Sequence, residues 1–126
     1  NTVSKNILYL GFKDDLIKYY NLCDCVVLPS YYREGVPKTL LEASACGKPM
    51  ITTDNIGCTD VVFDDYNGFL SKPKNHLDLL EKMEKFIKLS ENKKKLFGDR
   101  SRQLSLKKYD VNIVVKEYIT VINNIL

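Results

Sequence analysis

The sequence predicts an α/β fold in which a Rossmann-like parallel sheet is flanked by helices. Two short apolar runs, residues 25–29 and 48–53, have the length and β-branched content of strands buried on both faces. Between them, residues 37–46 carry the start and stop signals of a helix. Because ligands bind beyond the carboxyl ends of the strands in such folds, the loops after both runs are the places to look for a site.

The helix between the two strands is marked at both of its ends. Pro37 suits the first helical position, because its fixed φ matches the helix and its missing N–H has no partner there. Gly47 ends the helix, and Pro49 follows two residues later. Upstream, residues 14–22 suit a short helix with an acidic start, and we expect its tyrosines to pack rather than to stack on a base.

The last third of the chain is expected to be helical. Asn75 can cap a helix whose apolar residues recur with the 3.6-residue period of one helix face. A strongly charged helix begins at about Glu91, and a closing helix runs over about 111–125 with an apolar face. The predicted fold therefore ends in helices.

Composition excludes several classes of protein. The chain has 126 residues, about one domain, with 44% hydrophobic and 28% charged residues, and it lacks an apolar run long enough to span a bilayer. Its four cysteines lack metal-site spacing, and we interpret them as small buried residues in a reducing cytoplasm. The single histidine, His76, lies at a predicted helix start, and this position argues against a Ser-His-Asp hydrolase or a His-based metal centre. The sequence has no P-loop motif, which argues against a P-loop NTPase.

Positive charge is concentrated in residues 72–108, which hold twelve Lys or Arg against five Asp or Glu. We favour a solvated face of two helices as the explanation. The functional alternative is attraction to an anionic leaflet, where each basic residue contributes about 1 kcal/mol. Nucleic acid is disfavoured, because the basic run lacks interleaved aromatic residues and known binding motifs.

Residues 34–42, Glu-Gly-Val-Pro-Lys-Thr-Leu-Leu-Glu, carry the most functional information. A helix N-terminus has unpaired amides and partial positive charge, so it attracts phosphate. A carboxylate one turn inside the helix could accept hydrogen bonds from two ribose hydroxyls. Taken by itself, the pattern is more typical of an ordinary surface ion pair between Lys38 and Glu42, and the flanking strands shift the balance toward a binding site. The candidate amide donors to a diphosphate are those of Gly35, Val36, Lys38 and Thr39.

The stretch from Pro29 to Pro49, Pro-Ser-Tyr-Tyr-Arg-Glu-Gly-Val-Pro-Lys-Thr-Leu-Leu-Glu-Ala-Ser-Ala-Cys-Gly-Lys-Pro, resembles the donor-binding core of group 1 (family 4) glycosyltransferases. These are retaining enzymes of the GT-B fold, with two Rossmann-like domains facing across a cleft. Residues 6–12 resemble the family's strand and Gly-Phe loop beside the nucleotide base. Residues 67–70 resemble its late strand, and Tyr109-Asp110 precedes what resembles its closing helix.

The resemblance implies roles for individual residues. Glu34 would contact the transferred sugar or its phosphate and is the catalytic candidate. Glu42 would bind the ribose, and the helix N-terminus from Gly35 would hold the diphosphate. Thr59 and Asp60 stand where relatives often carry Arg-Glu, so they are assigned no role. The implied substrate-binding set is Gly11, Phe12, Ser30, Glu34, Gly35, Val36, Lys38, Thr39 and Glu42.

We expect residues 1–126 to be a single, N-terminally truncated donor-binding domain whose acceptor-binding domain is absent. The parent would be a hexosyltransferase that takes a UDP-sugar donor and a sugar or lipid-linked glycan acceptor, in cell-surface polysaccharide synthesis. The resemblance implies no essential metal and no cofactor beyond the donor substrate. We expect a cytoplasmic protein, with peripheral contact to the inner face of the membrane as an option. The alternatives are a nucleotide-sugar epimerase or hydrolase of the same fold and a non-enzymatic nucleotide-binding or partner-binding module.

Overall fold

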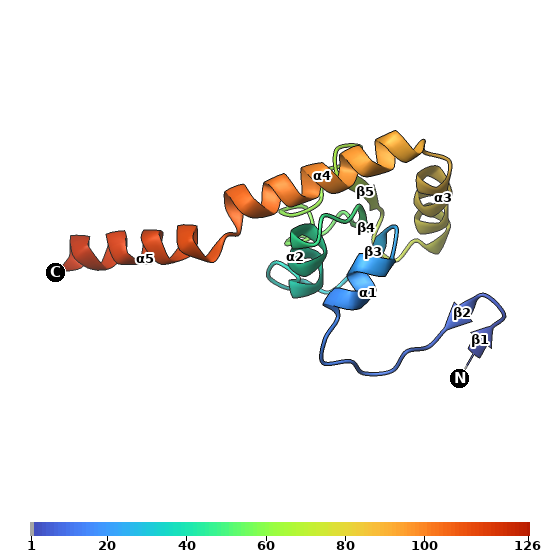
Figure 1. Ribbon diagram of the computed structural model, residues 1–126, viewed down its shortest axis with the longest axis horizontal. Helices are drawn as coiled ribbons and strands as arrows, with labels where there is room; N and C mark the ends of the chain where they lie inside the picture. The colour runs from blue at the N-terminus through green and yellow to red at the C-terminus, as the bar shows by residue number, and fades with distance from the viewer. Residues whose placement is uncertain (1) are drawn as a thin grey trace.

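A three-stranded parallel sheet forms the centre of the computed structural model, which describes residues 2–126 (Figure 1). Its strands are β3 (Val26–Leu28), β4 (Met50–Thr53) and β5 (Gly68–Ser71), in the order β3-β4-β5. Val26 pairs with Met50 in β4, and Met50 pairs with Gly68 in β5. The predicted α/β class with a parallel sheet is confirmed.

Five helices accompany the sheet within residues 2–126. α2 packs against α4, and α3 packs against β5. α5 projects away from the rest of the fold (Figure 1), and none of its residues is buried. No helix in this part of the chain combines the length and apolar character that crossing a membrane requires. The bounds are α1 (Ile17–Leu22), α2 (Lys38–Ala45), α3 (His76–Ile87), α4 (Glu91–Lys108) and α5 (Val111–Ile125).

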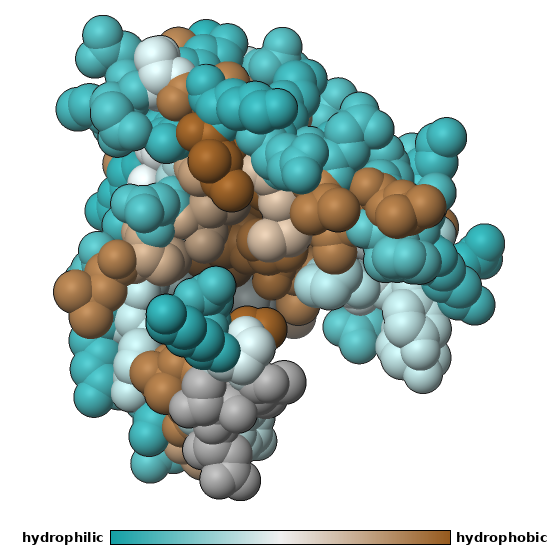
Figure 2. Space-filling model, turned by 90° about the vertical axis from the view of Figure 1, so that its right-hand side faces the viewer, coloured by the Kyte–Doolittle hydropathy of each residue, from teal (hydrophilic) through white to brown (hydrophobic). Residues whose placement is uncertain are grey.

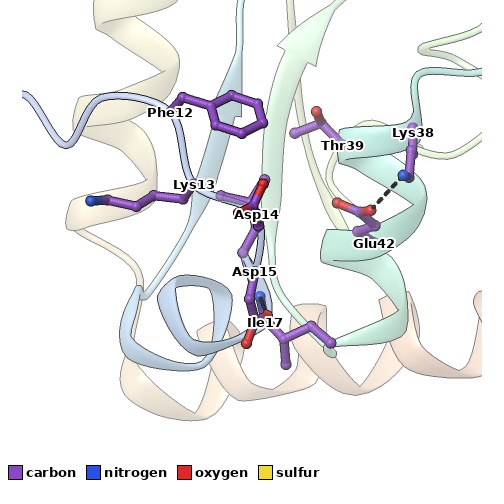
Figure 3. A pocket seen from close by; sticks show the side chains of 9 residues that line it. Phe12, Lys13, Asp14, Asp15, Ile17, Lys38, Thr39 and Glu42 are labelled. Carbon is purple, nitrogen blue, oxygen red and sulfur yellow. Dashed lines mark hydrogen bonds and ion pairs between the residues drawn. The ribbon is translucent and has the colours of Figure 1, made fainter.

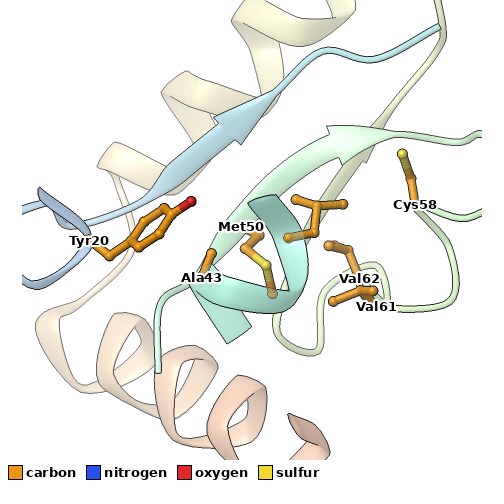
Figure 4. Close-up of a cluster of buried hydrophobic side chains, with 7 residues drawn as sticks. Tyr20, Ala43, Met50, Cys58, Val61 and Val62 are labelled. Atoms are coloured by element: carbon orange, nitrogen blue, oxygen red, sulfur yellow. The ribbon is translucent and has the colours of Figure 1, made fainter. Parts of the chain in front are cut away.

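Two cores lie on opposite faces of the sheet, because neighbouring residues of a strand point to opposite sides. Met50 belongs to a core that includes α2, and the adjacent Ile51 belongs to a core with three phenylalanines. All four residues of β4 are buried, as expected for a central parallel strand. The first core contains Tyr20, Leu40, Ala43, Met50, Cys58, Val61 and Val62 (Figure 4). The second contains Ile51, Phe69, Phe86 and Phe97, with Phe69 and Phe97 in an edge-to-face contact at 5.5 Å between ring centroids.

The helix ends follow the sequence signals closely. Gly47, with φ of +68°, ends α2; its amide donates to Ser44, and the amide of Lys48 donates to Ala43. Asn75 caps α3 by accepting from the amide of Asp78 at 3.0 Å. Pro37 was predicted to be the first helical residue, but it is the N-cap of α2, one position before the helix, with an extended ψ of 126°. Its carbonyl already accepts the first helical hydrogen bonds, so helical dihedrals begin at Lys38.

The N-terminal segment departs from the resemblance. The strand implied over residues 6–12 is reduced to β2 (Ile7–Leu8), which pairs antiparallel with β1 (Thr2–Ser4) in a separate two-stranded sheet. Ile7 and Leu8 are exposed, and β2 is not part of the parallel sheet. α1 also begins later than the predicted residue 14, because Asp15 accepts from the amide of Ile17 and marks the start.

Candidate functional site

A pocket of about 390 Å³ lies between the segment that precedes α1 and the first turn of α2 (Figure 3). It contains four of the predicted substrate-binding residues: Phe12, Lys38, Thr39 and Glu42. The ring of Phe12 is 88% exposed and follows Gly11, whose φ is +68°. The full lining consists of Phe12, Lys13, Asp14, Asp15, Leu16, Ile17, Lys38, Thr39 and Glu42. The structure therefore brings the Gly-Phe loop and the first turn of α2 to one cavity.

The N-terminus of α2 is open toward ligands. No side chain caps it, whereas Asn75, Ser90 and Asp110 cap α3, α4 and α5. Within residues 2–126, no group accepts a hydrogen bond from the amides of Lys38 and Thr39. Unpaired amides with the partial positive charge of a helix end are suited to an anionic group such as phosphate.

Glu42 is held by two neighbours. Lys38 Nζ lies 3.6 Å from Glu42 Oε1, and the hydroxyl of Tyr20 donates to Glu42 Oε2 at 3.0 Å. Burial, and then the hydrogen bond to Glu42, raises the pKa of Tyr20 to about 12, so this hydroxyl remains a donor at neutral pH. Since 35% of the Glu42 side chain is exposed, the oriented carboxylate can still accept from a ligand.

Tyr20 is a site residue that the sequence analysis missed. Its ring packs in the first core, as predicted, and it is only 7% exposed. One general rule could have identified Tyr20 as a residue with a specific partner, because a buried tyrosine hydroxyl usually forms a hydrogen bond. The partner lies 22 residues away in sequence, and nothing local identifies it.

The loop that carries Glu34 is held in place by the end of β4 and the segment that follows it. Gly57, with φ of +88°, lies so close that a Cβ on it would stand 2.4 Å from the carbonyl oxygen of Gly35. Asn55 Nδ2 donates to the carbonyl of Tyr32 at 2.9 Å, and Thr53 Oγ1 donates to that of Ser30. Glu34 itself is exposed. The loop backbone is thus held firmly while the catalytic candidate stays accessible.

Five predicted residues lie outside the lining of the pocket: Gly11, Ser30, Glu34, Gly35 and Val36. Gly35 is exposed in the adjoining loop, and Ser30 contributes its carbonyl to the loop support. The side chain of Val36 packs against the first core, which leaves only its backbone for a ligand. No cluster of His, Cys, Asp and Glu able to hold a metal ion occurs in the part of the chain described, residues 2–126.

Comparison with known proteins identifies the family. The model for "Glycosyl transferases group 1" matches residues 2–104. The chain is 35% identical over 118 residues to the N,N'-diacetylbacillosaminyl-diphospho-undecaprenol alpha-1,3-N-acetylgalactosaminyltransferase of Campylobacter jejuni, covering 94% of this chain and 31% of the relative. It is 29% identical over 125 residues to the capsular polysaccharide biosynthesis glycosyltransferase CapM of Staphylococcus aureus, covering 99% of this chain and 32% of the relative.

Solved structures agree with this identification. Anabaena Alr3699/HepE in complex with UDP and glucose superposes with a TM-score of 0.87 at 22% identity, covering 95% of this chain and 32% of that one. The C-terminal domain of the group 1 glycosyl transferase LpcC from Francisella tularensis superposes with a TM-score of 0.69 at 25% identity, covering 83% and 53%. The chain spans about a third of the length of its curated relatives. It belongs to the group 1 glycosyltransferases and corresponds to their C-terminal domain.

Proposed function

We propose that the full-length protein transfers a sugar from a nucleotide-diphosphate donor, a UDP-sugar, to a sugar or lipid-linked glycan acceptor, with retention of the anomeric configuration. The observation that carries this proposal is the open N-terminus of α2 in the same pocket as the oriented carboxylate of Glu42. A diphosphate and a ribose are joined in every nucleoside-diphosphate sugar, and this pocket offers a complementary group for each.

The proposed donor would lie in the pocket in a defined direction. The amides of Lys38 and Thr39 would donate hydrogen bonds to the diphosphate, and Glu42 would accept hydrogen bonds from the ribose hydroxyls. Phe12, on the other wall of the pocket, and the preceding Gly11 would lie beside the base. UDP is favoured because a solved structure that this fold matches closely holds UDP and glucose.

Catalysis would depend on stabilising the leaving diphosphate. Groups aimed at charge that develops in the transition state are the most effective electrostatic device. In this chain these are the amides at the start of α2, with Lys38 beside them. Glu34 would position the transferred sugar from the loop held by Gly57. We propose no covalent nucleophile, metal or cofactor for this step.

The proposed acceptor is a lipid-linked sugar, used in cell-surface polysaccharide synthesis. The Campylobacter jejuni relative is named for a diphospho-undecaprenol acceptor, and the Staphylococcus aureus relative is named for capsular polysaccharide biosynthesis. An acceptor of this kind would place the full-length protein at the cytoplasmic face of a membrane as a peripheral protein.

An amide NMR titration of this chain with UDP, and separately with GDP, tests the donor site. We expect saturable chemical-shift changes in residues 34–42 and at Gly11. The nucleotide that binds with the lower dissociation constant identifies the base of the donor. Glu42→Gln should weaken UDP binding about tenfold, the loss of a charge-assisted contact. Glu117→Gln, on the exposed helix α5, is the matched control and should change nothing. Absence of chemical-shift changes in both this chain and the full-length protein would refute the proposed transferase function.

A further inference from the structure

The two outer strands of the parallel sheet, β3 and β5, differ in how far they are covered. Three of the four residues of β5 are buried, and α3 packs against this strand. None of the three residues of β3 is buried, and Val27, at its centre, is 36% exposed. The described chain therefore covers one outer strand and leaves the other open.

The backbone of β3 has a free side. The amide of Val26 donates to the carbonyl of Pro49, at the start of β4, at 3.0 Å. Successive residues of a strand direct their N–H and C=O groups to alternate sides, so those of Val27 point away from β4. Within residues 2–126, β4 is the only strand that pairs with β3. Natural sheet edges are commonly protected by lysine, proline or a bulge, and Val26–Leu28 has none of these.

An apolar pocket of about 410 Å³ lies beside this open edge. Val27, Ile51, Met83, Phe86 and Ile87 form its apolar walls, and the lining is completed by Asp24, Cys25 and Lys94. Ile51 and Phe86 belong to the second core, so the pocket is continuous with that core. Ile87, at the end of α3, is 69% exposed. On the side of the molecule where α3 and the hairpin of β1 and β2 lie, hydrophobic residues gather around a hollow (Figure 2).

An extended segment with one apolar face would satisfy both the open backbone and the apolar pocket. The full-length protein can supply it, because the chain spans about a third of its curated relatives and covers only 53% of the solved C-terminal domain of LpcC. A second copy fits less well. A strand of three residues is about 10 Å long, too short to support the roughly 1,200–2,000 Å² that a stable interface between two proteins buries.

We propose that the open edge of β3 pairs with a further strand of the full-length protein, contributed from outside residues 1–126, and that this segment covers Val27, Met83 and Ile87. The pairing would make β3 an inner strand like β4, whose four residues are all buried. Because β3 leads directly into the loop that carries Glu34, it would also hold the beginning of that loop. This pairing does not depend on which substrate the protein uses.

Hydrogen exchange of the full-length protein tests the backbone pairing. We expect the amide of Val27 to exchange as slowly as that of Ile51, in the inner strand β4, because both would be bonded within the sheet. Exchange of Val27 at the rate of an exposed amide would overturn the proposal. Protection that is lost on dilution, together with dissociation of a dimer in light scattering, would overturn it in favour of a second copy.

The side-chain contact is tested by Ile87→Lys in the full-length protein. A lysine at a bare position is tolerated, whereas one beneath a covering segment should lower Tm by about 5–10 °C. Leu106→Lys is the matched control, because Leu106 is 48% exposed on α4 and lies outside this pocket. Its Tm should change by less than about 2 °C. Equal changes in the two variants would show that Ile87 is uncovered and would overturn the proposal.

Discussion

Replacing Gly57 by alanine should displace the loop that carries Glu34. The added Cβ would stand 2.4 Å from the carbonyl oxygen of Gly35, 2.9 Å from its carbon and 3.0 Å from the carbonyl oxygen of Glu34. Ordinary contact begins at 3.4 Å, so the loop backbone must retreat by about 1 Å. A misplacement of about 1 Å in a catalytic group can cost about a hundredfold in rate. We therefore expect the full-length enzyme to lose about that factor in kcat.

Donor affinity separates this effect from general damage. The proposed diphosphate and ribose partners, Lys38, Thr39 and Glu42, are on α2, and Gly57 makes its close contacts with Gly35 and Glu34 instead. The dissociation constant for UDP should therefore change by less than about threefold, which is below 1 kcal/mol. Sugar-transfer kinetics with the full-length protein and a UDP titration of this chain provide the two measurements.

Backbone strain needs its own control, because alanine at positive φ is unfavourable by about 1–2 kcal/mol. Gly11 has a φ of +68°, similar to the +88° of Gly57, but a Cβ there meets nothing within 4 Å. Gly11→Ala should show the strain alone, and Gly57→Ala should unfold at lower urea concentration than Gly11→Ala. A folded Gly57→Ala enzyme with an unchanged transfer rate would refute the idea that this contact positions Glu34.

Three further predictions concern the buried polar groups. Tyr20→Phe should weaken UDP binding and lower the free energy of unfolding by about 0.5–1.5 kcal/mol, measured by urea denaturation, because Glu42 loses its donor. Because the pKa of Tyr20 is raised to about 12, its contribution to stability should be complete below the usual pKa of 10.0 and fall as pH rises toward 12, a loss absent in Tyr20→Phe. Asn67→Ala should lower the free energy of unfolding by about 1–3 kcal/mol, because the partly buried amide of Phe63 and the buried carbonyl of Val61 lose their partner.

Local signals predicted most of the fold. The strands at residues 26–28 and 50–53 and the caps at Gly47 and Asn75 each depend on a few neighbouring residues, and the structure confirms them. Asp110 likewise caps the closing helix by accepting from the amide of Asn112. Backbone preferences and cap geometry are local properties, so one sequence is enough to read them.

The parts of the site that escaped prediction depend on contacts between distant segments. Tyr20 and Glu42 meet only after α1 and α2 have packed, and Gly57 meets Gly35 only after β4 has paired with β3. In the N-terminal segment the sequence predicted more than the structure contains. Residues 6–12 favour a strand of the main sheet, but only Ile7 and Leu8 form a strand, β2, and both are exposed. Burial decides such cases, and burial is not a local property.

The lysines of α3 and α4 do more than make a solvated face. Lys85 Nζ lies 4.5 Å from the centre of the Phe69 ring, and Lys94 Nζ lies 5.6 Å from that of Phe86, so both cover the second core. An aromatic contact of this kind contributes about 0.5–1 kcal/mol at exposed sites, and replacing either lysine changes packing as well as charge. A test of membrane attraction should therefore remove an exposed lysine such as Lys107. Weaker vesicle binding after Lys85→Gln alone would reflect lost packing as readily as lost charge.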